Sequence, residues 1–212
     1  METLNEMGLR HQTDKASTHH CFLDNYERHL GHLRDKEFTM IEIGVASGAS
    51  IRLWREYFSN AKIYGIDNNP DCAGEGIFIG NQNDTEFLDR VLAETGIPEV
   101  VIDDGHHWGP STIASFKHLF PKIKEGGLYI VEDFHCAYCP TYGPAPAYGQ
   151  GMSEVYKFFS ALDIHVDVYG RSMTGDPDRA INTPVETPPV PEYSRILKAI
   201  HIYQSLRILE RR

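Results

Sequence analysis

The sequence predicts an α/β fold with a mostly parallel, seven-stranded sheet, helices on both faces and an antiparallel hairpin at the C-terminal edge. Short apolar runs alternate with helical patterns from about residue 39 to residue 133, which is typical of a parallel sheet. The chain then ends in two apolar runs, Ile196–Tyr203 and Ser205–Leu209, joined by a tight connection. A connection that short favours an antiparallel pair.

Each element in the alternating region has a local signal. The strands share a short apolar run, and they are Thr39–Ile43, Lys62–Ile66, Gly76–Ile79, Pro98–Ile102 and Leu128–Val131. The helices share apolar residues on one side, and they are Cys21–Leu33, Ile51–Phe58, Asp84–Thr95 and Pro110–Phe120. The third helix has the clearest ends, because Asn83 or Asp84 can cap it and Gly96 stops it. Pro110 suits the first turn of the fourth helix.

The region after residue 133 is less regular. We expect a helix at Ser153–Leu162, a further strand at Ile164–Tyr169 and a Pro-rich loop at Gly170–Tyr193. The 212 residues predict a single domain. Within it, residues 1–38 form an N-terminal substrate or lid segment, 39–133 the cofactor-binding core, 134–193 the lid and connecting loops, and 194–212 the edge hairpin.

Composition excludes several classes of protein. The net charge of −10 argues against binding to nucleic acid, which needs clustered Lys and Arg. There is no apolar run of about 18 residues to span a membrane, and the polar N-terminus does not resemble a signal peptide. Four cysteines are too few for a disulfide scaffold, so we expect a cytoplasmic protein. We also expect a homo-oligomer.

A glycine-containing turn follows the first strand, as Glu42-Ile43-Gly44-Val45-Ala46-Ser47-Gly48. Glycines there let the backbone approach a ligand, but the pattern is not the G-x-G-x-x-G of a diphosphate site. Glu42 suits a cationic amino-acid ligand, and Asp67, at the end of the second strand, suits ribose hydroxyls. The combination predicts S-adenosylmethionine binding rather than NAD or FAD, and therefore a Rossmann-like class I methyltransferase fold. The alternative is that Gly44 and Gly48 only form a turn and Asp67 only caps a loop.

Two acidic pairs end neighbouring strands of the predicted sheet. Asp103 and Asp104 end the fourth strand, and Glu132 and Asp133 end the fifth. Several carboxylates held together require a cation, and their oxygens suit Mg²⁺ (or Mn²⁺). We expect Asp104, Glu132 and Asp133 to be the metal ligands. Asp103 is as well explained as a cofactor contact or a helix cap. The alternative for the set is that these acids cap the following helices.

Histidines near these acids supply candidate bases. His107 lies three residues past Asp104 and could take a proton from a substrate hydroxyl. His106 is its near rival. His135 is another candidate near the substrate. Further candidates are Asn83 for binding the cofactor, and Thr13, Asp14, Lys15 and Trp108 for binding the substrate.

Other distinctive residues have plainer explanations. Trp54 and Trp108 are expected to be packing groups, although Trp108 could also border the substrate. The pair Cys136-x-x-Cys139 has no second pair, so we interpret it as a loop feature rather than a zinc site.

Taken together, these residues resemble the Mg-dependent sugar O-methyltransferases of antibiotic biosynthesis. The macrolide and rhamnosyl enzymes of the mycinamicin and tetracenomycin type are the relevant members, and they are akin to cephalosporin hydroxylase-like proteins. The resemblance rests on T-D-K (Thr13–Lys15), Y-E-R-H-L (Tyr26–Leu30), I-E-I-G, Y-G-I-D, I-D-D-G-H-H, G-G-L-Y-I-V-E-D and I-H-I-Y, from about His11 to Glu210. These motifs are specific in combination, not singly.

The resemblance implies methyl transfer from S-adenosylmethionine to a sugar hydroxyl of a glycosylated natural product. On matching positions it implies that Asp104, Glu132 and Asp133 hold the metal and that His107 is the base. Family members often have Asp-Gly-Ser-His where this chain has Asp104-Gly105-His106-His107, so a second imidazole can compete. The chain is also short, without the N-terminal domain of some relatives. Two alternatives remain: a metal-dependent O-methyltransferase of phenols or catechols, and a non-catalytic accessory protein that binds S-adenosylmethionine.

Overall fold

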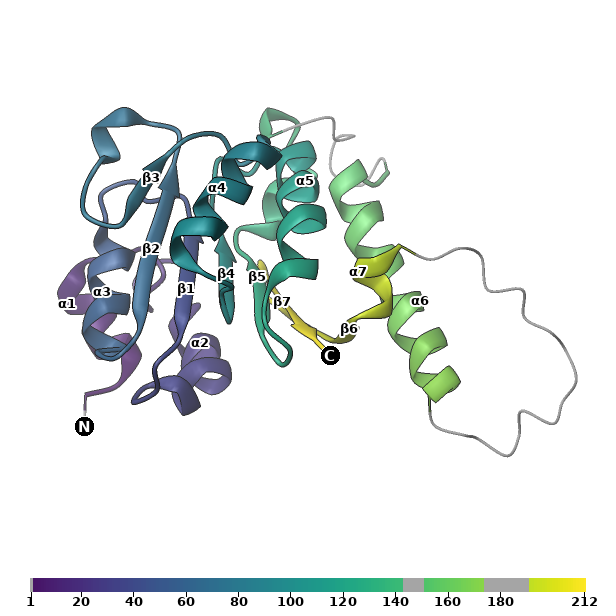
Figure 1. Ribbon diagram of the computed structural model, residues 1–212, viewed down its shortest axis with the longest axis horizontal. Coiled ribbons are helices and arrows are strands. Elements are labelled where there is room, and N and C mark those ends of the chain that lie inside the picture. The colour runs from purple at the N-terminus through teal and green to yellow at the C-terminus, as the bar shows by residue number, and fades with distance from the viewer. Residues whose placement is uncertain (1, 143–150, 174–190) are drawn as a thin grey trace, which may run out of the picture. The chain divides into compact units, whose positions relative to one another are not determined.

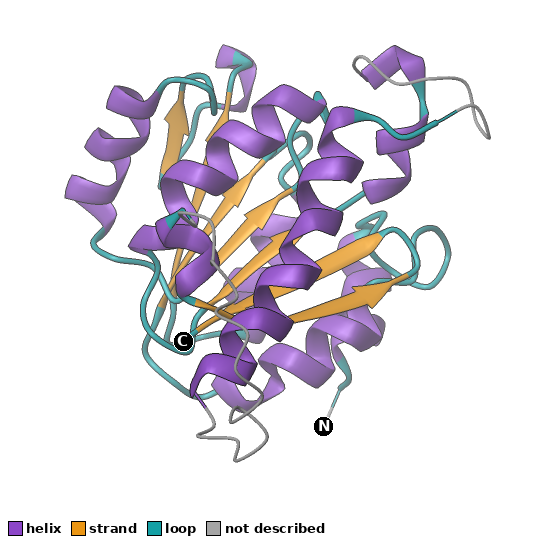
Figure 2. Ribbon diagram, turned by 90° about the vertical axis from the view of Figure 1, so that its right-hand side faces the viewer, coloured by secondary structure: helices purple, strands orange, loops and turns teal. Residues whose placement is uncertain are grey.

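The computed structural model describes residues 2–142, 151–173 and 191–212 of the chain. They divide into two compact units, Met1–His106 and His107–Arg212. The strands form a seven-stranded sheet in the order β3-β2-β1-β4-β5-β7-β6 and are the orange arrows in Figure 2. The predicted fold class is therefore confirmed. The assignment of 1–212 to a single domain stays a prediction.

Unit 1 contains the parallel part of the sheet. Its strands are β1 (Thr39–Ile43), β2 (Lys62–Asp67), β3 (Ile77–Ile79) and β4 (Val100–Asp103). β1 pairs with β2 on one side and β4 on the other, and β2 pairs with β3, all in parallel. Every residue of β1 and β4 is buried. Continuous burial explains why both strands are mostly apolar and do not alternate between apolar and polar residues.

The helices of unit 1 begin and end at recognisable signals. They are α1 (Leu4–His11), α2 (Leu23–Leu30), α3 (Ala49–Tyr57) and α4 (Thr85–Thr95), with 3₁₀ helices η1 (Gly31–Leu33) and η2 (Pro70–Cys72). Asp84 caps α4 by accepting a hydrogen bond from the backbone N–H of Phe87 at 3.0 Å, and Gly96 ends it. Both ends were predicted. In the core, the rings of Tyr26 and Trp54 lie 5.1 Å apart, so Trp54 is a packing group as expected.

The sequence analysis did not predict α1. This helix begins with a reciprocal capping box between Thr3 and Glu6, and it ends at Gln12, whose φ is 59°. Its last turn is attached to α3, which lies beside it in Figure 1. Arg10 and His11 both reach Glu56, with Nη2–Oε1 at 2.7 Å and Nε2–Oε2 at 2.6 Å. These contacts direct the chain that follows, Thr13–Lys15, towards the carboxyl ends of the strands.

Unit 2 contains the antiparallel part of the sheet. Its strands are β5 (Leu128–Val131), β6 (Leu197–Tyr203) and β7 (Leu206–Arg211). β7 is antiparallel to both β5 and β6, which confirms the predicted hairpin. The helices are α5 (Gly109–Leu119), α6 (Glu154–Met173) and α7 (Glu192–Arg195), with 3₁₀ helices η3 (Phe120–Lys122), η4 (Phe134–Tyr138) and η5 (Pro140–Tyr142). Buried Phe116 lies 5.2 Å from the rings of both Tyr129 and Phe159 and forms the centre of this core.

One predicted strand, Ile164–Tyr169, is wrong. These residues continue α6, which is a single helix of 20 residues. The alternation of Ile164, Val166 and Val168 imitates a strand, but the buried residues Val155, Phe159 and Leu162 have helical spacing and fix the helix register. The Pro-rich loop Gly170–Tyr193 is wrong at its ends, because residues 170–173 belong to α6 and Glu192 and Tyr193 to α7. Its centre, 174–190, lies outside the described residues.

In the parts of the chain that the structure describes, no helix combines the length and the apolar character needed to cross a bilayer.

The attachment of α1 to α3 predicts a pH dependence of stability. Hydrogen bonds from Arg10 and then His11 lower the pKa of Glu56 from its ordinary value of 4.5 to about 2. A carboxyl with a lowered pKa stabilises the folded state above pH 4.5, and this contribution is lost as pH falls from 4.5 towards 2. We expect Glu56→Gln to lower the Tm at pH 7 but to leave it unchanged near pH 2.

Thermal unfolding followed between pH 2 and pH 7 measures this difference. Glu154→Gln is the matched control, since it removes an exposed ion pair to Lys157 within one helix. A constant Tm difference between wild type and Glu56→Gln across the range would contradict the assignment.

Candidate active site

The turn after β1 is shaped by a close approach of two backbones. Gly44 has φ +93°, and a Cβ there would lie 1.9 Å from the backbone oxygen of Asp104. The N–H of Gly44 donates to the carbonyl of Ile66 at 2.8 Å, and the N–H of Asp104 donates to Ile43 at 2.9 Å. Only glycine fits this position, both for its φ and for the space available. The close approach brings the turn after β1 against the turn after β4.

Asp67, at the end of β2, fixes the same turn. Its Oδ2 accepts hydrogen bonds from the backbone N–H groups of Val45 at 2.8 Å and Ala46 at 3.2 Å, and its Oδ1 accepts one from Asn69 at 2.8 Å. Burial acts to raise the pKa of Asp67, but the bonds from Asn69, Val45 and Ala46 outweigh it and hold the pKa below its ordinary value. The side chain is therefore an anion at neutral pH.

A cavity of about 440 Å³ lies at the carboxyl ends of the unit 1 strands. That volume is in the range of small-molecule and cofactor sites. Several predicted site residues line it: Thr13, Asp14, Lys15, Gly44, Asp67, Asp104 and His106. Asn81 and Gln82, which the sequence analysis missed, line it too. Their signal was available, since they directly follow the predicted strand Gly76–Ile79.

Gln82 also explains the position of Asp103. The Nε2 of Gln82 donates to Asp103 Oδ1 at 3.1 Å and Oδ2 at 3.3 Å, and both side chains are buried. Asp103 therefore lies behind the cavity wall and is not among the lining residues. Gly48 and Asn83 do not line it either: Gly48 precedes α3, and the N–H of Asn83 donates to Asn81. Contacts of these three residues with a cofactor stay predictions.

Glu42, predicted to face a cationic ligand, is wholly buried. Its Oε2 accepts a hydrogen bond from Ser50 at 2.8 Å, and its Oε1 lies 3.4 Å from the ammonium of Lys15. Burial raises the pKa of Glu42, and the Lys15 charge opposes that shift. Within unit 1, Glu42 thus contacts Ser50 and Lys15. Its contact with a cofactor stays a prediction.

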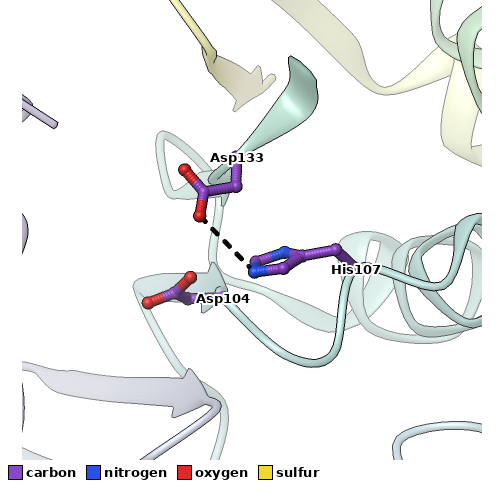
Figure 3. Close-up of side chains that lie close together, drawn as sticks. All are labelled: Asp104, His107 and Asp133. Atoms are coloured by element: carbon purple, nitrogen blue, oxygen red, sulfur yellow. Dashed lines mark ion pairs between the residues drawn. The ribbon is translucent and has the colours of Figure 1, made fainter. Parts of the chain in front are cut away.

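Unit 2 contributes His107 and Asp133, which point toward each other in Figure 3. His107 Nε2 lies 3.5 Å from Asp133 Oδ2, marked by the dashed line. Both residues have positive φ, 55° and 48°, a conformation that costs about 1 kcal/mol or more outside glycine. Strained backbone at both residues is typical of a functional site.

Contacts with the C-terminal hairpin hold the segment that follows Asp133 in place. The N–H of Phe134 donates to the carbonyl of Ser205 at 2.9 Å, and His135 Nδ1 lies 2.5 Å from Ser205 Oγ. The guanidinium of buried Arg207 lies 4.0 Å from the centre of the Phe134 ring. The sequence analysis missed Ser205 and Arg207, because their importance comes from the antiparallel pairing of β5 with β7.

The other candidates in unit 2 have mixed outcomes. Glu132 is buried and, with His107 and Asp133, lines a small cavity of about 10 Å³. Trp108 is 40% exposed, so its expected role as a packing group is wrong, and a border with the substrate stays a prediction. Cys136 and Cys139, in and just after η4, do not form a disulfide.

Comparison with known proteins shows which enzymes this chain is similar to. No family model matches the chain. It is 33% identical over 221 residues to the 8-demethyl-8-(2-methoxy-α-L-rhamnosyl)-tetracenomycin-C 3′-O-methyltransferase of Streptomyces olivaceus, which covers 98% of this chain and 53% of the relative. It is 30% identical over 224 residues to the mycinamicin VI 2″-O-methyltransferase of Micromonospora griseorubida, covering 98% and 52%. The chain is homologous to antibiotic sugar O-methyltransferases.

A solved structure extends this homology to the fold. The MycE methyltransferase of the mycinamycin pathway, in complex with Mg and SAH, matches with a TM-score of 0.81 and 29% identity. The match covers 99% of this chain and 53% of MycE. The chain thus spans about half the length of the sugar O-methyltransferases it matches.

The close approach at Gly44 generates a prediction. We expect Gly44→Ala to unfold more easily than wild type and to lose affinity for S-adenosylhomocysteine, because the added Cβ must push away the backbone of Asp104. Gly126→Ala is the matched control, since Gly126 has φ +75° but no atom within 4 Å of an added Cβ. The overpacking should cost Gly44→Ala about 1–3 kcal/mol more than this control.

Chemical denaturation measures the stability of both variants, and calorimetry measures the affinity for S-adenosylhomocysteine. Equal losses of stability in the two variants would show that φ alone, and not the contact with Asp104, explains the glycine.

Proposed function

We propose that this protein is an S-adenosylmethionine-dependent O-methyltransferase that requires a divalent metal and acts on a sugar hydroxyl of a glycosylated natural product. The observation that carries the proposal is the match of nearly the whole chain to MycE in complex with Mg and SAH. The relatives include sugar O-methyltransferases of macrolide and tetracenomycin products. We further propose a cytoplasmic homo-oligomer.

The cavity of unit 1 is the proposed site for S-adenosylmethionine. Gly44 gives the ligand access to the backbone, and Asp67 is an anion at its edge with lone pairs for ribose hydroxyls. Residues 39–133 would thus bind the cofactor. The segment Thr13–Lys15 lines the same cavity and would reach the acceptor side.

Asp104, Glu132 and Asp133 are the proposed metal ligands. They follow or end β4 and β5, which the strand order makes neighbours, and carboxylate oxygens are the donors that Mg²⁺ prefers. The donor set therefore fits a hard divalent cation. Such an ion, when bound, would stabilise negative charge on the acceptor oxygen.

His107 is the proposed general base. Asp133 lies 3.5 Å from its Nε2 and favours a ring orientation in which this nitrogen faces the Asp133 carboxylate. Nε2 would accept the proton of the acceptor hydroxyl. The oxygen then forms a bond to the methyl carbon as the bond from that carbon to sulfur breaks, and S-adenosylhomocysteine leaves. His106 lines the cofactor cavity, so its position suits a substrate contact better.

We expect His107→Ala to lower kcat about 10²- to 10⁴-fold, because a positioned base contributes roughly that factor. The assay follows methyl transfer to a panel of glycosides by mass. His106→Ala is compared in parallel, and its affinity for S-adenosylhomocysteine shows whether the cavity is intact. A greater loss in His106→Ala than in His107→Ala would move the base to His106.

The metal role predicts that EDTA abolishes turnover and that added Mg²⁺ restores it. Asp133→Asn should weaken the metal affinity about tenfold or more while the protein stays folded, because Asn tolerates the positive φ of this position. Asp71→Asn, on an exposed 3₁₀ helix, is the control. Turnover that is insensitive to EDTA would exclude the metal but not the methyl transfer.

Methylation of catechols in preference to glycosides would favour the phenol alternative, and binding of S-adenosylmethionine without turnover would favour an accessory protein.

A further inference from the structure

The N-terminal segment places a buried ammonium beside a proposed metal ligand. Lys15 is 1% exposed and is among the largest fully buried side chains of the described residues. Its Nζ pairs with Oδ2 of Asp104 and lies 3.4 Å from Oε1 of Glu42. A buried ammonium is costly unless carboxylates compensate it, so the three side chains form one charged cluster.

The backbone holds Lys15 firmly in this position. Its carbonyl accepts hydrogen bonds from the N–H groups of Phe22 at 2.9 Å and Leu23 at 3.3 Å, and its N–H donates to Thr13 Oγ1 at 3.4 Å. Helix α1 packs closely against Leu23, because a Cβ on Gly8 would lie 2.1 Å from the Leu23 side chain. The ammonium is therefore placed by packing and does not depend on a flexible surface side chain.

Asp104 is held from its other side as well. Its N–H donates to Ile43, and its carbonyl lies against Gly44. With the backbone fixed, the ammonium of Lys15 is one of the partners that orient the carboxylate. A second cation that approached the same Oδ2 would meet the positive charge of Lys15 at short range.

This geometry bears on the choice of metal. Mg²⁺ keeps several waters and binds through single carboxylate oxygens at 2.0–2.1 Å, whereas Ca²⁺ takes six to eight oxygens and accepts both oxygens of one carboxylate. A carboxylate with one oxygen committed to an ammonium offers a metal its other oxygen only. It disfavours the chelating arrangement that Ca²⁺ uses.

We propose that Lys15 is a specificity-determining residue of the metal site, which restricts Asp104 to one-oxygen coordination and so favours Mg²⁺ over Ca²⁺. The inference rests on the proposed role of Asp104 as a metal ligand. It assigns Lys15 a function in metal choice in place of the substrate contact suggested by the sequence.

The test compares charge-balanced variants. Lys15→Met alone leaves Glu42 buried without a counter-charge, so it is combined with Glu42→Gln. The double variant removes one positive and one negative charge, and each new side chain has a volume similar to that of the one it replaces. Glu42→Gln alone is the matched control, because it keeps Lys15 on Asp104 and can still bond Ser50. Circular dichroism and thermal unfolding check that both variants fold.

Mn²⁺ binding to the whole chain is measured by the electron paramagnetic resonance of free Mn²⁺, and Mg²⁺ and Ca²⁺ are then titrated as competitors. We expect wild type and Glu42→Gln to prefer Mg²⁺, and the double variant to shift the ratio of the two dissociation constants toward Ca²⁺ by about tenfold or more. An unchanged ratio in the double variant, or the same shift in Glu42→Gln alone, would overturn the role of Lys15. Absence of Mn²⁺ binding in wild type would instead contradict the proposed metal site itself.

Discussion

The contact between the backbones of Gly44 and Asp104 is the constraint on which the candidate site depends. β1 and β4 are paired in parallel, and their carboxyl ends turn away from the sheet at the same level. The two turns are so close that residue 44 has no room for a side chain. This crowding has two consequences. It opens the turn after β1 to a ligand, and it fixes the backbone of Asp104, so that the direction of its carboxylate is set by its neighbours.

The acidic residues of each unit have defined partners. Asp67 is stabilised as an anion by backbone N–H groups, and it needs no cation for this purpose. Glu42 and Asp104 share the ammonium of Lys15. In unit 2, Asp133 faces His107 and is carried by a backbone of positive φ. The acidic residues that look alike in the sequence therefore have three different electrostatic environments.

Prediction of secondary structure from short sequence patterns failed where tertiary contacts decide between a helix and another structure. Residues 164–169 alternate like a strand, yet they continue α6, whose register is set further back where Phe159 and Leu162 are buried. Helix α1 is polar and short, so its periodicity was not visible. It is held by the burial of Leu4 and Met7, by a capping box and by ion pairs to Glu56, a residue 46 positions from Arg10. Such long-range partners leave no signal in a local window.

The sequence by itself determined the sheet, the hairpin and the positions of the site residues along the chain. It did so because buried parallel strands are continuous apolar runs, because glycine marks a backbone of unusual φ, and because ligands bind where strands end. Only the tertiary structure decided what each side chain faces. It placed Lys15 between two carboxylates, put Asp103 behind Gln82, and linked the segment after Asp133 to Ser205 and Arg207. These are contacts between segments far apart in the chain, and their geometry follows from packing and strand pairing, not from the residues that flank each position.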